Sequence, residues 1–256
     1  MALSDVSFVR THVPYDSHND LYNLATLSGY PVVHTADVDP YDASKCYIFG
    51  KINSEWDNGY GGVKARLIWY NLEWTDNRPA PAGFAEQWHM DAGFAKRNSL
   101  RYVPVGSHPL LRAAQGDCER IYDVSFLSYF THRRELIRDG LKQRGLTIAP
   151  QGWGMQRHDV LSKSRLMLHV HQSDEGRGIA GLRWAIAAAY KLPLISETVD
   201  DLGIFSAWDF LQADYENISL KLANTIHLLA LSEYTDTLYN KLCVENTFRA
   251  IVDRSL

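Results

Sequence analysis

Residues 165–196 read RLMLHVHQSDEGRGIAGLRWAIAAAYKLPLIS. Residues 165–171 and 192–196 are apolar runs of strand length, and the alanine-rich residues 178–191 between them have the length and composition of a helix. A polar turn with two glycines leads from the first predicted strand into this helix. A strand, a helix and a second strand in this order form a right-handed βαβ unit, so the stretch predicts a parallel sheet.

The same alternation of strand and helix continues along the chain in both directions. It predicts an α/β fold with mostly parallel sheets. The predicted strands cover residues 5–13, 31–34, 46–50, 65–70, 100–105, 122–127 and 146–149, and the predicted helices cover 21–28, 84–97, 132–144, a short stretch ending at 160–164, and much of the chain beyond 217.

The length and composition indicate two globular domains. The chain has 256 residues, of which 46% are hydrophobic and 22% charged. Residues 106–109 and 114–117 are rich in glycine and polar types and form the predicted linker. We expect an N-terminal domain over residues 1–110 and a C-terminal domain with terminal helices over residues 118–256. Two α/β domains of this kind bind ligands in the cleft between them.

Several classes of protein are disfavoured by the sequence. No apolar run is long enough to span a bilayer, and the first residues lack the pattern of a secretory signal. Cys46, Cys118 and Cys243 are too far apart for a Cys-x-x-Cys metal site, so a reducing, cytoplasmic compartment is expected. The net charge of −4 argues against a purely electrostatic nucleic-acid binder.

The charge is unevenly distributed along the chain. Residues 133–191 contain eleven Lys or Arg and five Asp or Glu, a balance of +6, so the remaining residues sum to −10. A basic centre in an acidic protein is what a local anion site requires. The alternative is that these cations lie on solvated helix faces.

The glycine turn at residues 172–178 is the first candidate for an anion site. Helix N-termini present free backbone N–H groups and a partial positive charge, and Gly176 and Gly178 would let the backbone approach a ligand. Glu175 and Arg177 lie in the same turn, and Arg183 follows about a turn and a half into the helix, where it could clamp a diphosphate. A surface role for Arg183 is the alternative.

Residues 128–134 form a second candidate, again between a strand and a helix. Backbone donors, Thr131 and the adjacent Arg133 and Arg134 would converge on one edge of the sheet. Neighbouring side chains on a helix point about 100° apart, so we expect at most one arginine to reach a ligand and the other to be solvated.

These segments carry a resemblance to a known family. YDVSFL at 122–127 with Arg133 and Arg134, LSKSRLMLHVH at 161–171, Leu182-Arg183, and LISE at 194–197 resemble the C-terminal half of GT-B glycosyltransferases, especially the spore-maturation-protein-like group of the family 1/4-like enzymes. The resemblance covers roughly residues 122–215. Residues 67–73 and 102–109 are compatible with the N-terminal domain of that family but are less specific.

The resemblance implies two Rossmann-like domains, with a nucleoside diphosphate sugar, foremost a UDP-sugar, held mainly by the second. It implies an acceptor site in the first domain and no strict need for a metal or cofactor. Many members place a donor-binding Glu where this chain has Ile186, so either Glu175 or Glu197 substitutes or donor recognition differs. The donor-binding residues we expect are Thr131, Arg133, Arg134, His171, Glu175, Gly176, Arg177, Gly178, Arg183 and Glu197.

Metal sites have weaker support. Asp37-Val38-Asp39 resembles the Asp-x-Asp motif of another glycosyltransferase class, but it comes too early in the chain and precedes a proline. His169 and His171 share one face of a predicted strand, but no Cys or carboxylate has convincing spacing to them. We expect these histidines to line the cleft or to form core hydrogen bonds.

The polar residues 14–20 after the first predicted strand are the best source of a general base. Loops at the carboxyl ends of parallel strands open into the cleft, where His18 or Asp16 could remove the proton from an acceptor hydroxyl. A helix cap is the alternative role for Asp16. Glu73, at the end of its predicted strand, is the reserve candidate.

The sequence therefore predicts a glycosyltransferase that moves a sugar from a nucleoside diphosphate to a hydroxyl acceptor. A soluble acceptor is expected rather than a lipid, and a hydroxymethylated base in DNA, as in phage DNA glucosyltransferases of this fold class, is one candidate. The alternatives are a non-catalytic nucleotide- or sugar-binding protein and an enzyme similar to nucleotide-sugar epimerases.

Overall fold

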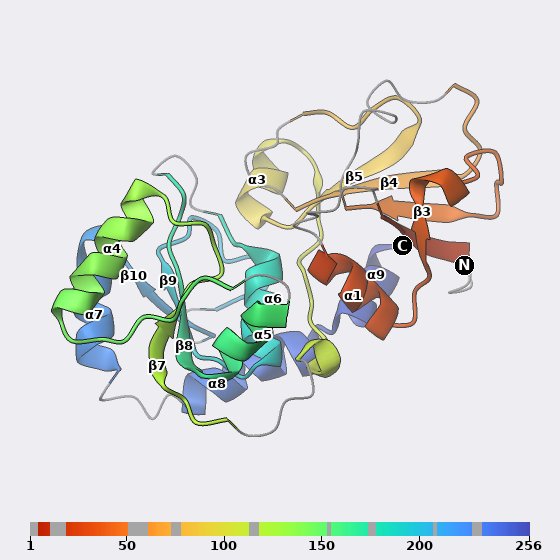
Figure 1. The fold of residues 1–256 in the computed structure, drawn as a ribbon. Helices are drawn as coiled ribbons and strands as arrows, with labels where there is room; N and C mark the ends of the chain where they lie inside the picture. The colour runs from red at the N-terminus through yellow and green to blue at the C-terminus, as the bar shows by residue number, and fades with distance from the viewer. Residues whose placement is uncertain are drawn as a thin grey trace.

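The computed structural model describes residues 5–10, 19–50, 61–72, 78–112, 118–152, 155–173, 178–206, 209–226 and 232–256. These residues form two sheets, each made of parallel strands (Figure 1). The first sheet has the order β2-β1-β3-β4-β5-β6 and the second the order β10-β9-β8-β7. The α/β class predicted from the sequence is confirmed. The strands are β1 (Val6–Arg10), β2 (Val32–His34), β3 (Cys46–Phe49), β4 (Arg66–Asn71), β5 (Phe84–His89), β6 (Arg101–Tyr102), β7 (Tyr122–Ser125), β8 (Ser164–His169), β9 (Leu194–Glu197) and β10 (Leu211–Ala213).

Helices lie between the parallel neighbours β1 and β2, β5 and β6, β7 and β8, and β8 and β9, as βαβ units require. Two of them end where glycine allows a positive φ: Gly29 after α1 has φ +84° and Gly145 after α4 has φ +79°. The helices are α1 (Asn19–Leu27), α3 (Ala92–Arg97), α4 (His132–Gln143), α5 (Met155–Ser162), α6 (Gly181–Ala189), α7 (Ile218–Thr225), α8 (Ser232–Tyr239) and α9 (Phe248–Ser255).

The predicted helix over residues 84–97 is wrong for its first half. Residues 84–89 form β5, which pairs with β4, and only Ala92–Arg97 form a helix. The alanine, glutamate and glutamine in this strand favour a helix on their own. However, Trp88 is fully buried and its ring packs edge-on against Tyr70 of β4 at 5.8 Å, so tertiary packing overrides local preference.

Two smaller differences concern the second sheet. The predicted strand at 146–149 is reduced to one bridge between Ile148 and Val124, flanked by backbone hydrogen bonds. Strand β10 was not predicted, because three residues give too short a pattern to recognise. It pairs with β9 and extends the sheet on that side.

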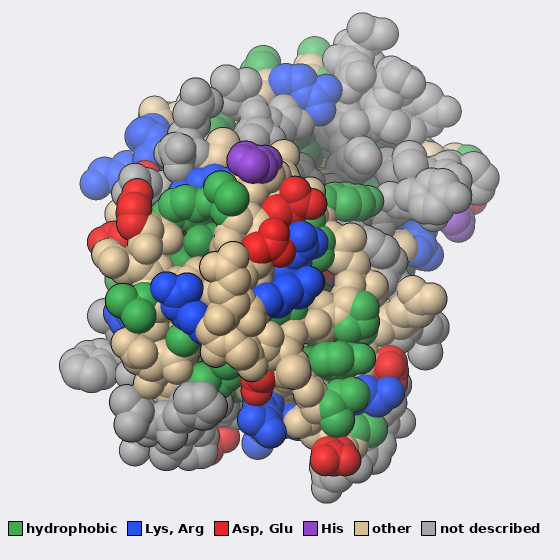
Figure 2. Space-filling model, turned by 60° about the vertical axis from the view of Figure 1, so that its left-hand side comes forward, with side chains coloured by type: hydrophobic (Ala, Val, Ile, Leu, Met, Phe, Trp, Pro, Cys, Tyr) green, Lys and Arg blue, Asp and Glu red, His purple; other side chains and the backbone are tan. Residues whose placement is uncertain are grey.

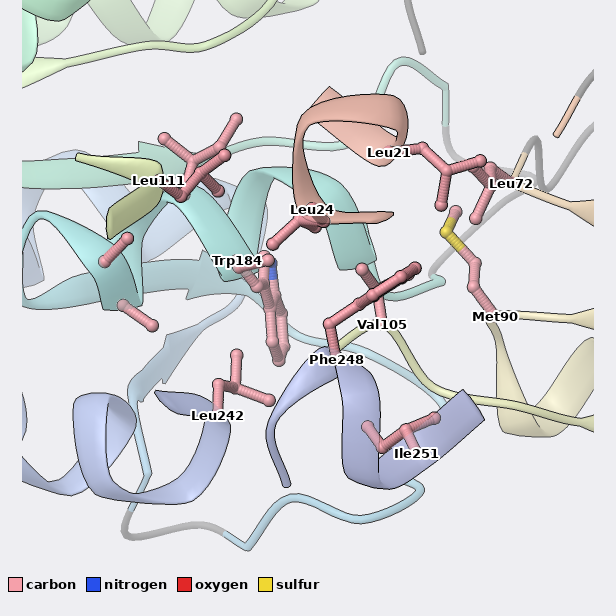
Figure 3. Close-up of a cluster of buried hydrophobic side chains, with 14 of the residues drawn as sticks. Leu21, Leu24, Leu72, Met90, Val105, Leu111, Trp184, Leu242, Phe248 and Ile251 are labelled. Carbon is pink, nitrogen blue, oxygen red and sulfur yellow. The ribbon is translucent and has the colours of Figure 1, made fainter. Parts of the chain in front are cut away.

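A hydrophobic core joins the two halves of the chain (Figure 3). Leu24 of α1, Val105 after β6, Trp184 of α6 and Phe248 of α9 meet in this cluster, and each is at most 2% exposed. Because the cluster draws on both halves, burial of apolar surface stabilises their arrangement as well as each half.

The last helix returns to the first half of the chain, where Figure 1 shows the C-terminus beside the first sheet. The Tyr30 hydroxyl donates to Asp253 of α9 at 2.5 Å, and Arg66 of β4 donates to the carbonyl oxygen of Leu256 at 2.8 Å. The start of the predicted linker packs in the same region. Ser107 pairs with Thr247 in a parallel bridge, and its hydroxyl donates to the carbonyl oxygen of Ala185 at 2.6 Å.

None of the helices in the part of the chain described above is both long and apolar enough to cross a bilayer.

Candidate functional site

Three neighbouring strands of the second sheet end at one edge, and charged residues follow each of them. The strands β7, β8 and β9 are parallel, so their carboxyl ends lie together. Arg133 lies in the first turn of α4 after β7, His171 follows β8, and Glu197 is the last residue of β9. The fold thus brings together three residues that are distant in sequence. The two furthest apart, Arg133 and Glu197, are separated by 64 positions.

Arg133 and Glu197 form an ion pair with two parallel hydrogen bonds. The Nη1 and Nη2 atoms of Arg133 donate to the two carboxylate oxygens at 2.6 Å each. The guanidinium also lies 3.6 Å from the centre of the Tyr215 ring, and the Tyr215 hydroxyl donates to the carbonyl oxygen of Arg133 at 2.9 Å. Glu197 additionally accepts the backbone N–H of His171 at 2.9 Å. Both partners are therefore held in fixed orientations.

Arg134 is buried and bonds to backbone carbonyl groups. Its Nε donates to Val170 after β8, and its Nη1 donates to Tyr129 in the segment after β7, both at 2.9 Å. Burial, and then the charges of Arg183 and Arg133, lower the pKa of Arg134 to about 10. Arg134 therefore links the end of β8 to the segment after β7, with Arg183 and Arg133 nearby.

The prediction that one of these two arginines is solvated is wrong. Arg134 is 4% exposed, and the side chain of Arg133 is 13% exposed. The first turn of α4 packs against the ends of β8 and β9, so both side chains find partners there.

Two histidines lie at the end of β8 with their rings perpendicular and 5.1 Å apart. Burial, with the charges of Arg183, the neighbouring histidine and Arg134, holds the pKa of His169 well below its ordinary value. Burial also lowers the pKa of His171, whose Nε2 hydrogen-bonds to the carbonyl oxygen of Thr198 at 3.0 Å. Both rings are therefore neutral at pH 7.

Two buried nitrogen atoms beside the arginines have no hydrogen-bond partner within the described parts of the chain. They are Nε2 of His169 and Nε1 of Trp184, whose ring centres are 6.4 Å apart. Thr131 presents a similar case, because it holds the N-cap position of α4 but its buried hydroxyl oxygen makes no capping bond. Most buried polar atoms in proteins have a hydrogen-bond partner, so these three atoms are candidates to bind a ligand or water.

Three arginines lie close to this edge. Arg183 is near enough to lower the pKa values of both Arg134 and His169, and Arg133 pairs with Glu197, so positive charge is concentrated here. Arg183 belongs to helix α6, whose N-cap residue Ala180 makes no side-chain capping bond. Arginines beside a helix N-terminus favour an anionic ligand.

The glycine turn is described only in part. Gly178 is partly exposed just before α6, whereas Glu175, Gly176 and Arg177 lie outside the described residues. The three candidates for the base, Asp16, His18 and Glu73, also lie outside them. Their assignment stays a prediction from the sequence.

Asp20 follows the candidate base residues in sequence and forms an ion pair with the second half of the chain. Its carboxylate oxygens accept from Arg157 of α5 at 2.6 and 2.7 Å, and the residue is 5% exposed. This ion pair ties the first turn of α1 to the second half of the chain.

Asp91 is a site residue that the sequence did not single out. It is the N-cap of α3, and its Oδ2 accepts the backbone N–H of Ile179, one residue after Gly178. An aspartate between a strand and a helix is a recognisable cap signal. The incorrect helix prediction over 84–97 placed Asp91 inside a helix and concealed that signal.

No group of three or more His, Cys, Asp or Glu side chains in the described residues is arranged to hold a metal ion. The aspartates of the Asp-x-Asp motif stabilise local turns instead. Asp37 accepts the backbone N–H of His34 at 3.3 Å, and Asp39 accepts that of Tyr41 at 2.9 Å.

The outer face of the second half is mixed in charge. Figure 2 brings forward the side of Figure 1 that carries α4 and α7, and acidic and basic side chains are interspersed on it. The basic segment 133–191 therefore does not make this face uniformly positive. Arg133 and Arg134 direct their charge to the strand ends instead.

Comparisons with known proteins agree with this architecture. No family model matches the chain. The uncharacterised protein L140 of Acanthamoeba polyphaga mimivirus is 29% identical over 104 residues, which is 38% of this chain and 31% of that protein. The chain thus spans about a third of the length of this curated relative.

Three solved glycosyltransferases share the fold along nearly the whole chain. AviGT4, an enzyme of avilamycin A biosynthesis, superposes with a TM-score of 0.59 at 12% identity over 98% of this chain and 95% of that protein. The T4 phage β-glucosyltransferase, solved with UDP and Mn²⁺, gives 0.56 at 13% identity over 97% and 96%. An α1,3-fucosyltransferase with GDP gives 0.52 at 10% identity over 97% and 88%. The chain therefore has the GT-B fold of these glycosyltransferases.

Proposed function

We propose that this protein is a glycosyltransferase that moves a sugar from a nucleoside diphosphate sugar to a hydroxyl acceptor. The observation that supports this most strongly is the concentration of arginines where β7, β8 and β9 end, within a GT-B fold. Arg133, Arg134 and Arg183 lie near one another there, and Arg183 lies in α6. A diphosphate carries the charge that such a site stabilises.

The three arginines have different roles in this proposal. Arg183 contacts the diphosphate, together with Gly178 and the rest of the turn at 175–178. Arg133 orients Glu197 through two hydrogen bonds, and Arg134 fixes the strand ends through its bonds to two backbone carbonyl groups. Thr131 and His171 complete the donor site. Where Ile186 replaces the usual glutamate, either Glu175 or Glu197 takes the ribose, or donor recognition differs, and Glu197 would have to do so while bonded to Arg133 and to the backbone of His171.

The neutral histidines suit a site that binds an anion at physiological pH. An imidazole that is protonated only under acidic conditions contributes a hydrogen bond without adding a charge that varies near pH 7. The donor that we expect first is a UDP-sugar. Structures of the same fold with UDP and with GDP support nucleotide binding without choosing between the two.

The acceptor would be activated by a base from the first half of the chain. His18 or Asp16 is the proposed base, and Glu73 is the candidate if neither of them acts as the base. In the sequence, Asp16 and His18 come between β1 and α1, and Glu73 comes two residues after the end of β4. The donor is held by the other half, so transfer takes place between the two halves.

We further propose DNA with a hydroxymethylated base as the acceptor to test first. The fold is shared with a phage enzyme described as DNA-modifying, and residues 133–191 carry a balance of +6. The motif resemblance to the spore-maturation-protein-like group supports glycosyl transfer in general and does not specify an acceptor.

The reaction can be tested by measuring the release of nucleoside diphosphate from UDP-, GDP- and ADP-sugars, with and without hydroxyl acceptors. A glycosyltransferase releases the nucleotide and places the sugar on the acceptor. A non-catalytic binder releases none, and an epimerase converts the sugar while it remains attached to the nucleotide. Either of the last two results would refute the proposal.

The DNA acceptor has a separate test in the salt dependence of binding. Each phosphate contact releases counterions, so the affinity for DNA containing hydroxymethylated bases should fall steeply with salt concentration. Affinity that does not change with salt, or equal sugar transfer to a free hydroxymethylated nucleoside, would remove DNA as the acceptor while leaving sugar transfer itself intact.

A further inference from the structure

A buried carboxylate from the first half of the chain binds the segment that leads into helix α6. Asp91 follows β5 and is 4% exposed. Its Oδ1 accepts the backbone N–H of Phe94 at 2.7 Å, which caps α3. Its Oδ2 accepts the backbone N–H of Ile179 at 3.0 Å, 88 residues further along the chain. One side chain thus joins the starts of two helices in different halves.

The start of α6 depends on groups from outside its own segment. Helix N-termini leave four backbone N–H groups without intrahelical partners, and Ala180 at the N-cap makes no side-chain capping bond. Asp91 supplies an acceptor to the N–H of Ile179, directly before this cap. The first N–H groups of α6 have no acceptor within the helix itself, so the phosphates of a donor can serve as their acceptor.

A second contact fixes the same segment against the first half. A Cβ atom added to Gly181 would lie 2.7 Å from Cγ2 of Val105, so the helix begins in direct contact with this residue. Asp91 and Val105 therefore constrain neighbouring positions, Ile179 and Gly181. Arg183, the proposed diphosphate ligand, lies two residues beyond Gly181.

We propose that Asp91 is a positioning residue that sets the geometry of the donor-binding turn from the acceptor half. This inference rests on the proposed function, because it assumes that the turn before α6 binds the donor. Asp91 makes no contact with the donor itself. Its hydrogen bond to Ile179 holds the following N–H groups and Arg183 in the orientation that the diphosphate requires.

The variant Asp91→Ser separates this role from the capping of α3. Serine is a favourable N-cap and can accept the N–H of Phe94, but its side chain is too short to span to Ile179 as well. We expect a modest loss of thermal stability, because the buried N–H of Ile179 loses its acceptor, and a rise of about tenfold in the KM for the donor, with kcat nearly unchanged. Asp91→Ala should lose both the cap and the positioning.

Thr247→Ala is the matched control, because the Thr247 hydroxyl caps α9 through the N–H of Ala250, and the substitution keeps the backbone bridge from residue 247 to Ser107. It should lower stability without changing the KM for the donor. A donor KM that is unchanged or lower in Asp91→Ser, or raised equally in Thr247→Ala, would overturn the positioning role.

Amide hydrogen exchange in the protein without ligand tests the inference independently of activity. In Asp91→Ser the amides from Ile179 to Arg183 should exchange about tenfold faster, while Thr247→Ala leaves them unchanged. Equal exchange in Asp91→Ser and the unsubstituted protein would refute the contact's role, even if donor binding is confirmed. If the protein binds no nucleotide sugar, the proposed function fails, and the exchange result still decides whether Asp91 orders the turn.

Discussion

Arg133 and Glu197 face each other across the carboxyl edge of the second sheet, joined by two hydrogen bonds of 2.6 Å. The pair connects the first turn of α4 to the last residue of β9, and Glu197 also accepts the backbone N–H of His171 after β8. A single ion pair therefore fixes the ends of the elements that surround the proposed donor site.

Breaking this pair should be costly because the remaining charge is buried. We expect Arg133→Met to lower the free energy of unfolding by about 3–5 kcal/mol, since Glu197 would lose its partner in a site where water is scarce. Urea unfolding of Arg133→Met, Glu197→Gln and the double variant measures this. The double variant should lose much less than the sum of the single losses.

A matched control is Arg165, which pairs with Asp123 at 3.1 Å through a side chain that is 52% exposed. Arg165→Met should cost less than about 1 kcal/mol, as is usual for exposed pairs. If the losses in free energy of unfolding at Arg133 and Glu197 are additive, the buried pair does not act as a unit. The same conclusion follows if Arg133→Met and Arg165→Met lose equal free energy of unfolding.

The two histidines at the end of β8 should make stability depend on pH. Their pKa values in the folded protein lie below the ordinary value of 6.5. Below about pH 6.5 the unfolded chain therefore binds protons that the folded protein does not, so stability falls as the pH decreases. The maximum slope is about 1.4 kcal/mol per pH unit for each histidine.

Urea unfolding between about pH 7.5 and pH 5.5 checks this expectation. The variant His169→Gln should show a shallower decrease than the unsubstituted protein, because one of the two groups no longer titrates. Identical slopes for both proteins would mean that His169 is protonated as readily in the folded state as in the unfolded state.

Gly106 allows the C-terminal segment to pack against the middle of the chain. A Cβ atom here would meet the carbonyl oxygen of Asn246 and lie 2.6 Å from the backbone nitrogen of Phe248. We expect Gly106→Ala to displace residues 246–248 and to lower the free energy of unfolding by roughly 1–3 kcal/mol. Thermal unfolding measures the loss.

Gly61→Ala provides the comparison, since a Cβ atom added at Gly61 has no neighbour within 4 Å among the described residues. Its stability should equal that of the unsubstituted protein or exceed it slightly. If both variants lose the same stability, the close approach at Gly106 is not the cause.

The proposed base should be needed for transfer and not for donor binding. Removal of a positioned base typically lowers turnover by roughly 10²–10⁴-fold. His18→Ala or Asp16→Asn should therefore reduce kcat by about that factor and leave the affinity for the nucleotide sugar nearly intact. Steady-state kinetics with calorimetry on the same samples separates the two effects. Full activity in both variants would transfer the role to Glu73.

The sequence predicted those features of the fold that depend on local patterns. Apolar runs of strand length and the glycines at 29 and 145 located most strands and the ends of α1 and α4. It did not predict β5, whose composition favours a helix and whose state is decided by pairing with β4. Pairing across the sheet depends on residues far away in sequence, so no local pattern reveals it.

For the candidate site, the sequence predicted which residues would gather and not what they would contact. Parallel strands end at one edge, so Arg133, His171 and Glu197 could be placed together from strand order alone. The bonds of Arg134 to two carbonyl groups and of Asp91 to Ile179 depend on the packed positions of separate elements. Side-chain types alone could not distinguish such bonds from solvated or ligand-binding roles.

Calorimetric titration of a nucleotide sugar into the unsubstituted protein, Arg183→Ala and Arg144→Ala tests the central claim most directly. Arg144 lies just beyond the far end of α4 and donates to Gly140, so its loss removes the same charge away from the strand ends. We predict that Arg183→Ala weakens binding by about 1.5–3 kcal/mol, because a charge-assisted contact to phosphate is lost, and that Arg144→Ala has no effect. Equal affinity in all three proteins, or no binding of any UDP-, GDP- or ADP-sugar, would contradict the account.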